Sequence, residues 1–175
     1  GHIHYVVFGG SLFAMFAAID FWFPKMFGRM LNNWMGKVHF FVTIVAFNCT
    51  FFPMHILGVG GHMRRLYNPM QYDFLQPFQP LNEFMTVSAV VLGLAQVLLV
   101  VNMDWSMKCG RRAEPNPWNA NTLEWAVKSP PDHGNFTESP VVYRGPYEYS
   151  VPGIDTDFLP QNLDVSMLES NERPK

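Results

Sequence analysis

The chain has 175 residues, of which 49% are hydrophobic and 15% charged, and its formal net charge is −2 at pH 7. This balance argues against a nucleic-acid partner, because no block of basic residues supplies the positive surface that phosphates attract. The two cysteines, Cys49 and Cys109, lie within and just beyond apolar stretches, and they show neither a disulfide framework nor the CxxC spacing of a metal site. Composition therefore excludes a general nucleic-acid binder and leaves the redox compartment undetermined.

The apolar residues are concentrated in the first part of the chain. Nearly all long apolar stretches precede residue 107, whereas the remainder is polar and rich in proline. This distribution predicts an all-α membrane protein with three transmembrane helices, at about residues 2–24, 37–59 and 82–106. Residues 1–107 then form the transmembrane portion, and residues 108–175 form a largely irregular extension. The chain opens inside an apolar segment without a signal-peptide pattern, so we interpret it as part of a longer membrane protein.

The first predicted helix carries a single charge, Asp20, between Tyr5 and Phe23. At 1.5 Å per residue this stretch is about 28 Å long, close to the thickness of the hydrocarbon core. Trp22 and Lys25 follow at the depth where aromatic and cationic side chains meet lipid headgroups. Asp20 lies near that interface, which favours a snorkelling or hydrated carboxylate over a proton relay.

The second predicted helix contains too many polar residues to face only lipid. They are His39, Thr43, Asn48, Thr50 and His55. Buried polar groups need partners, so this helix is expected to pack inside a bundle, with both histidines hydrogen-bonded rather than ligating a metal. Pro53 removes a backbone donor and predicts a kink near the far end. The third run, from Phe84 to Met103, has no charge and is the clearest membrane span.

Basic residues near the helix ends predict the orientation in the membrane. Two segments carry three cations each, namely Lys25, Arg29 and Lys37 in the first connection and Lys108, Arg111 and Arg112 after the third helix. The loop between the second and third helices carries Arg64 and Arg65, which acidic residues balance. The positive-inside rule therefore places the first connection and the extension on the cytoplasmic side, and the middle loop toward the outer face.

Two histidines, His2 and His4, stand at the start of the first apolar run. In a helix each residue turns by about 100°, so positions i and i+2 point roughly 200° apart. The two rings cannot easily chelate one ion together, but each could ligate a different metal centre on either side of the helix. Ionisable residues at membrane depth are uncommon and often functional, although an interfacial or hydrogen-bonded role is the alternative for an isolated pair.

These residues belong to a longer series of motifs that resembles haem–copper oxidase subunit I, in particular the C-terminal portion of bacterial cytochrome c oxidase subunit I. His2-Ile-His4-Tyr-Val is similar to the His-Phe-His-Tyr-Val of that family's tenth transmembrane helix, with Ile3 in place of the phenylalanine. The further matches, in order, are Trp22-Phe-Pro-Lys25, Gly36-Lys-Val-His-Phe40, Asn48-Cys-Thr-Phe-Phe-Pro-Met-His55, Arg64-Arg65, Asn116-Pro-Trp, Thr122-Leu-Glu-Trp125 and Arg144-Gly-Pro-Tyr147.

The resemblance implies that the three helices correspond to the last three of a twelve-helix bundle. It implies that His2 ligates the iron of a high-spin haem, that His4 ligates the iron of a low-spin haem, and that Arg64 and Arg65 hold haem propionates. Guanidinium groups suit that task because they offer a planar fork of donors to carboxylates. The haems implied are a-type, and the copper of the oxygen-reducing centre (CuB) is bound by residues absent from this chain.

The function implied is that of a terminal respiratory oxidase, which reduces oxygen to water with electrons from cytochrome c and translocates protons across the bacterial cytoplasmic (inner) membrane. The chain alone is not expected to be active, since the copper ligands and the second axial ligand of the low-spin haem belong to earlier helices of the family. The implied partners are the remainder of subunit I, oxidase subunits II and III, cytochrome c and membrane lipid. A quinol oxidase of the same superfamily remains an alternative, as does a non-enzymatic membrane scaffold subunit.

Overall fold

The computed structural model describes residues 1–166, and residues 167–175 of the predicted extension lie outside the described part. The described chain consists of helices, turns and one isolated β-bridge, without a β-strand between residues 1 and 166. The predicted all-α class is therefore confirmed. The structure divides into two units, the first of residues 1–20 and 31–110, the second of residues 21–30 and those from 111 onward.

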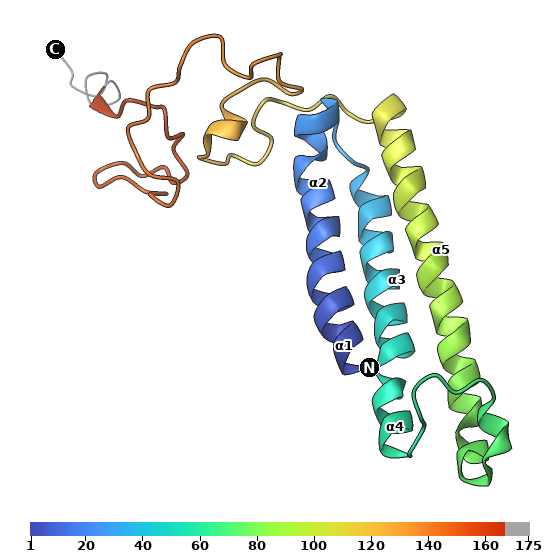
Figure 1. Cartoon of the computed structure of the whole chain (residues 1–175). Helices are drawn as coiled ribbons and strands as arrows, with labels where there is room; N and C mark the ends of the chain where they lie inside the picture. Colours follow the sequence, from blue (N-terminus) through green and yellow to red (C-terminus); the bar gives the residue numbers. More distant parts are fainter. Residues whose placement is uncertain (167–175) are drawn as a thin grey trace. The chain divides into compact units, whose positions relative to one another are not determined.

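The first helix runs without interruption from His2 to Phe27, through α1 (His2–His4), the π-helix η1 (Tyr5–Leu12) and α2 (Phe13–Phe27) (Figure 1). It ends at Phe27, three residues beyond the predicted boundary, and it continues through Pro24. Gly28 has a φ of +67°, and its N–H donates to the Pro24 carbonyl at 2.8 Å. A left-handed glycine just past the last turn is a common helix stop, since it has no Cβ to oppose that conformation.

The second span comprises α3 (Asn33–Phe51) and α4 (Pro53–Val59), which are separated at Phe52. The interruption falls next to Pro53, where the sequence predicts a kink, because proline lacks the donor that would continue the regular helix. The span starts earlier than predicted, at Asn33. The side chain of Asn32 accepts hydrogen bonds from the N–H groups of Trp34 and Met35, which caps the helix and shortens the first connection.

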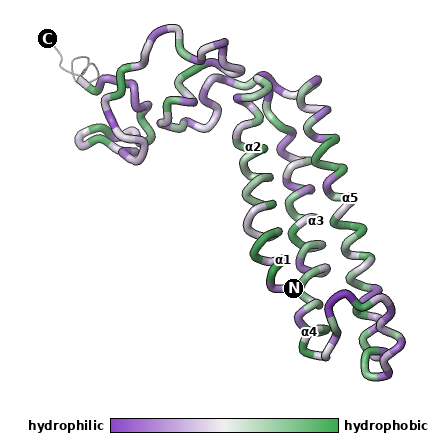
Figure 2. The backbone as a smooth tube through the Cα atoms, in the orientation of Figure 1, coloured by the Kyte–Doolittle hydropathy of each residue, from purple (hydrophilic) through white to green (hydrophobic). Residues whose placement is uncertain are grey.

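The third span is α5 (Gln79–Cys109), preceded by two 3-10 helices, η2 (Pro69–Gln71) and η3 (Asp73–Phe78), within the predicted loop. All three spans are long and apolar enough to cross a membrane, as predicted. Figure 2 shows the hydrophobic residues along these helices and the hydrophilic ones in the loop after α4 and in the extension.

Aromatic rings dominate the core of the first unit. Its buried cluster consists of Ala46, Phe47, Phe51 and Leu92, with Tyr5, Phe8, Phe13 and Met54 packed against it. Most other large apolar side chains of the three spans are exposed, for example Val87, Leu94 and Val97 at 57–64%. Such an apolar exterior is typical of helices that contact lipid or further transmembrane helices.

A buried polar cluster joins the start of α3 to α5. The side chain of Asn102 is 1% exposed. Its Oδ1 accepts hydrogen bonds from the Asn32 N–H at 3.1 Å and from the Ser106 hydroxyl at 3.0 Å. Its Nδ2 donates a hydrogen bond to the Asn32 carbonyl at 3.2 Å. The sequence pattern did not reveal this cluster, since Asn32 and Asn102 are 70 residues apart.

Replacing Asn102 with leucine is expected to destabilise the first unit by about 2 kcal/mol, because the buried Ser106 hydroxyl loses its acceptor and the two hydrogen bonds between Asn102 and Asn32 are lost. The measurement is the midpoint of thermal unfolding of the purified complex that contains this chain. Thr86→Val is the matched control on the same helix, since the Thr86 hydroxyl is exposed and bonds only its own helix, to the Asn82 carbonyl. Equal midpoints for the two variants would contradict the prediction.

In the second unit, the start of the extension is fastened to the end of α2. The Arg111 carbonyl accepts from the Met30 N–H at 2.8 Å, and the Ala113 N–H donates to the Gly28 carbonyl at 2.9 Å. The Trp118 indole N–H donates to the Phe21 carbonyl at 2.9 Å. These hydrogen bonds hold the start of the extension, which has no regular secondary structure, against the end of α2 and the residues that follow it.

Lys25 lies at the centre of this region and is only 8% exposed. Its ammonium donates to the carbonyls of Pro115, Val127 and Lys128, at 3.1, 2.7 and 3.4 Å, which we term the carbonyl cage. The same group lies 4.9 Å from the centre of the Trp125 ring, on the 3-10 helix η4 (Leu123–Trp125). The sequence pattern favoured a headgroup-depth cation at Lys25, whereas here the second unit encloses it.

Further along the extension, Arg144 ties two turns together. Its guanidinium donates to the carbonyls of Pro160 and Leu163, and the side chain of Gln161 donates back to the Arg144 carbonyl at 3.0 Å. The Tyr143 N–H also bonds the Gln161 carbonyl at 2.9 Å. The extension is thus organised by backbone and side-chain hydrogen bonds between loops rather than by regular secondary structure.

Candidate functional site

His2 and His4 lie on the single helical turn α1, and both side chains are exposed. The backbone at His4 and Tyr5 is right-handed helical, with φ near −65°. The two positions therefore have the spacing of a helix, in which side chains two residues apart point to different faces.

The rings of His2 and His4 carry no hydrogen bond within residues 1–166, whereas those of the other three histidines of the first unit do. His39 Nε2 lies 3.2 Å from Gln96 Oε1, His55 Nδ1 lies 3.1 Å from the Phe52 carbonyl, and His62 Nδ1 lies 3.1 Å from the Met63 carbonyl. The interpretation of His39 and His55 as hydrogen-bonded histidines is confirmed. The nitrogens of His2 and His4 are free to accept an external partner.

The surroundings of His4 are apolar and aromatic. Its ring stacks on that of Phe51, with 4.6 Å between the centroids and 14° between the planes. Ile3, Val7, Phe8, Leu12 and Met15 line, with His4 and Ser11, a hollow of about 410 Å³ on the surface of the helix. A flat apolar ligand could rest against this surface with its metal directed at an imidazole.

Arg64 and Arg65 belong to the loop after α4, and Figure 1 shows this loop at the same end of the first unit as the start of the chain. Both are exposed, and within residues 1–166 neither forms an ion pair. Arg65 has a φ of +61°, in the left-handed region that costs a non-glycine residue about 1 kcal/mol or more. No hydrogen bond or ion pair in the described chain joins these arginines to His2 or His4.

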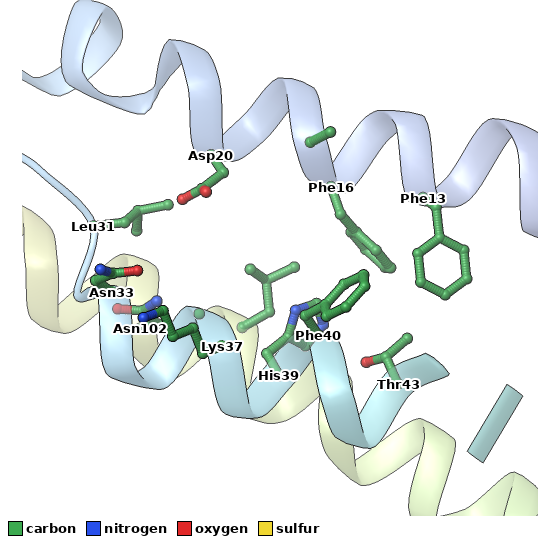
Figure 3. Close-up of a pocket in the computed structure, with 13 residues that line it drawn as sticks. Phe13, Phe16, Asp20, Leu31, Asn33, Lys37, His39, Phe40, Thr43 and Asn102 are labelled. Atoms are coloured by element: carbon green, nitrogen blue, oxygen red, sulfur yellow. The ribbon is translucent and has the colours of Figure 1, made fainter. Parts of the chain in front are cut away.

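The helices of the first unit also line an open cavity of about 390 Å³, which was not predicted from the sequence (Figure 3). Its polar lining comes from Asp20 on α2, Lys37, His39 and Thr43 on α3, and Asn102 on α5. A signal was present in the sequence, since Asn33, Gly36, Lys37 and Phe40 recur at the three- and four-residue spacing of one helical face. The cavity is lined on its other side by Phe13 and Phe16.

No group of three or more histidine, cysteine or acidic side chains that could hold a metal ion occurs among the described residues. A metal centre at His2 or His4 would therefore take one ligand from this chain and the rest from a cofactor or from other residues. This arrangement suits a metal that arrives already coordinated in a macrocycle.

The comparisons with known proteins agree with one another. The family model described as Cytochrome C and Quinol oxidase polypeptide I matches residues 1–91. Cytochrome c oxidase subunit 1 of Synechocystis sp. is 46% identical over 168 residues, which cover 96% of this chain and 29% of that relative. Alternative cytochrome c oxidase subunit 1 of Bradyrhizobium diazoefficiens is 44% identical over 164 residues, or 92% of this chain and 28% of the relative.

Cytochrome c oxidase subunit 1 of Bacillus subtilis is 40% identical over 144 residues, which cover 81% of this chain and 22% of that relative. The chain spans less than a third of the length of these relatives. The family match covers more than half of the chain and includes both histidines, both arginines and all of α1 to α4. The chain therefore belongs to the cytochrome c and quinol oxidase polypeptide I family, which is subunit I of the haem–copper oxidases.

Proposed function

We propose that this chain is part of the catalytic subunit of a bacterial terminal oxidase that reduces oxygen to water with electrons from cytochrome c and translocates protons. The observation that carries the proposal is the pair of helical histidines, His2 and His4, whose rings have no hydrogen-bond partner in residues 1–166. The names of the relatives, cytochrome c oxidase subunit 1, support cytochrome c rather than quinol as donor.

The residues around His4 fit a haem. An iron porphyrin takes axial imidazoles from the protein and contacts apolar side chains with its faces. The exposed ring of His4, the apolar hollow beside it and the stacked Phe51 provide both kinds of contact. We assign His4 to the iron of a low-spin haem and His2 to the iron of a high-spin haem. Bound there, the haems would supply the one-electron chemistry, while the chain sets ligand identity and supplies apolar contacts.

Arg64 and Arg65 are proposed to bind the haem propionates. Two exposed guanidinium groups without an ion-pair partner in the described chain leave their donors available to carboxylates. The strained backbone at Arg65 supports a functional role, because such conformations persist where the surrounding structure requires them.

Replacing either arginine with leucine is expected to lower the haem midpoint potentials by roughly 20–40 mV. A nearby cation stabilises the reduced haem, which is the more negative form, and losing one exposed cation removes about 0.5–1 kcal/mol of that stabilisation. Redox titration of the purified complex followed by visible absorption measures the change. Arg111→Leu, an exposed arginine of the extension, is the control and is expected to leave the potentials unchanged. A shift as large in the control would contradict the assignment.

The rest of the enzyme lies outside this chain. We propose that the remainder of subunit I supplies the copper ligands and the second axial ligand of the low-spin haem, and that oxidase subunits II and III complete the complex. The apolar exterior of the three spans supports contact with those helices and with lipid.

The experiment that tests the function is purification of the native complex, followed by haem analysis and oxygen uptake. A cytochrome c oxidase is expected to contain two haems per copy of this subunit and to consume oxygen with reduced cytochrome c. Uptake with quinol alone would favour the quinol oxidase alternative. A complex without haem would favour a scaffold subunit and overturn the proposal.

We also propose that the first connection and the extension lie on the cytoplasmic side of the membrane, as the distribution of cations supports. In a background lacking Cys49 and Cys109, Gln71→Cys is expected to react with a membrane-impermeant thiol reagent in intact spheroplasts. Ser139→Cys, an exposed residue of the extension, is expected to react only after permeabilisation. The reverse pattern would invert the proposed orientation.

A further inference from the structure

Tyr5 follows His4 directly and connects the histidine-bearing helix to α3. Its hydroxyl donates a hydrogen bond of 2.7 Å to Asn48 Oδ1. The Asn48 amide is itself oriented, because its Nδ2 donates to the Ile44 carbonyl at 2.8 Å, one turn earlier on α3. With its NH2 group engaged in this way, the amide presents its oxygen to Tyr5.

The Tyr5–Asn48 bond is the one side-chain hydrogen bond that joins residues 1–20 to residues 31–110 within the described first unit. The remaining contacts between this part of the helix and α3 include ring packing, such as Tyr5 on Phe47 at 4.9 Å and Phe8 on Phe47 at 5.4 Å. Apolar contacts hold two helices together without a strong directional preference, whereas a hydrogen bond weakens steeply when its angle changes. The Tyr5 hydroxyl therefore adds a directional restraint on the rotation of the helix about its axis, next to the two histidines.

The Tyr5–Asn48 bond lies at the start of a helical segment that is not a regular α-helix. Residues Tyr5–Leu12 form a π-helix, in which the backbone bonds are shifted by one residue relative to an α-helix. Metal-ligating histidines are usually oriented by a hydrogen bond on the second ring nitrogen. His2 and His4 have no such bond within residues 1–166, so their directions depend on the rotation of the helix and, for His4, on the Phe51 ring.

We propose that Tyr5 and Asn48 are positioning residues, whose hydrogen bond fixes the rotation of the helix and so the direction of the two axial imidazoles. The inference rests on the proposed function, since it assumes that His2 and His4 are axial ligands. Because both histidines share one helix, loss of the bond shifts the surroundings of both haems together.

The test uses Tyr5→Phe in the purified complex, which keeps the ring contacts and removes the hydroxyl. Haem content is expected to equal that of the unmodified complex, while the g values of the low-spin haem in electron paramagnetic resonance and the visible bands of both haems shift. Tyr147→Phe is the matched control, because Tyr147 is 83% exposed and its hydroxyl has no hydrogen bond within residues 1–166; its spectra are expected to remain unchanged.

Asn48→Leu removes the same bond from the other side, and it decides the outcome if Tyr5→Phe fails to assemble. The double variant is expected to shift the spectra no further than one single variant, since both substitutions delete one interaction. Spectra of Tyr5→Phe and Asn48→Leu that match the Tyr147→Phe control would overturn the inference. His4→Ala separates this result from failure of the proposed function, because that variant loses the low-spin haem only if His4 is a ligand.

Discussion

Replacing His4 with alanine is expected to remove the low-spin haem from the purified complex and to lower oxygen consumption by at least about 100-fold. Substitution of outer-shell partners of metal-ligating histidines already costs 10- to 100-fold, and loss of the ligand itself removes the bond. The absorption band and the paramagnetic signal of the low-spin haem report the loss directly. His2→Ala is expected to affect the high-spin haem instead, because the proposed function assigns the two histidines to different irons.

Two further variants make the His4 prediction decisive. His4→Met supplies a thioether, a known axial ligand, and is expected to retain low-spin haem with a raised midpoint potential. His133→Ala alters an exposed histidine of the extension and is expected to leave both haems in place. Normal intensity of both haem signals in His4→Ala would show that the imidazole is not a ligand and would remove the central support for the proposed function.

Replacing Lys25 with methionine is expected to release the start of the extension from the end of α2. Methionine keeps much of the apolar stem but lacks the ammonium that binds the carbonyl cage and faces the Trp125 ring. The lost charge-assisted bonds correspond to about 3 kcal/mol, or roughly a 100-fold rise in the population of the released extension. Limited proteolysis of the purified complex with proteinase K measures this population when opening is fast relative to cleavage.

Lys128→Met is the matched control for Lys25→Met. The Lys128 side chain is 61% exposed and pairs with Asp132 at 2.5 Å on the surface, an arrangement that contributes little to stability. Its substitution is expected to change the cleavage rate by less than about threefold, since its carbonyl, which belongs to the cage, is retained. Equal cleavage of the two variants would show that the buried ammonium does not hold the extension.

Much of the helical architecture was predictable because it depends on local chemistry. A run of about 20 apolar residues is long enough to span the hydrocarbon core, and proline removes a backbone donor, although α2 continues through Pro24 while α3 ends before Pro53. The boundaries were less predictable. Gly28 ends the first span and Asn32 caps the second span. Together they shorten the connection between the two spans, which was predicted from composition to reach Lys37.

The candidate site was likewise predictable only in part. The opposed directions of His2 and His4 follow from their spacing, and the paired arginines stand next to each other in the chain. Only the structure showed that the histidine ring nitrogens have no hydrogen-bond partner, and the two guanidinium groups no ion-pair partner, among residues 1–166. The polar cavity beside Asp20 and Lys37 was missed, because its lining comes from three helices.

Residue order is sufficient for the three apolar helices, the interruption next to Pro53 and the angular separation of His2 and His4, since each depends on neighbours within a few turns. The partners of Tyr5, Asn102 and Lys25 required the folded chain. Those hydrogen bonds join residues 43, 70 and 90 to 103 positions apart, and no local pattern specifies which polar groups will meet across such distances. Packing of the helices and the course of the extension bring them together, because a buried polar group is stable only when it is paired.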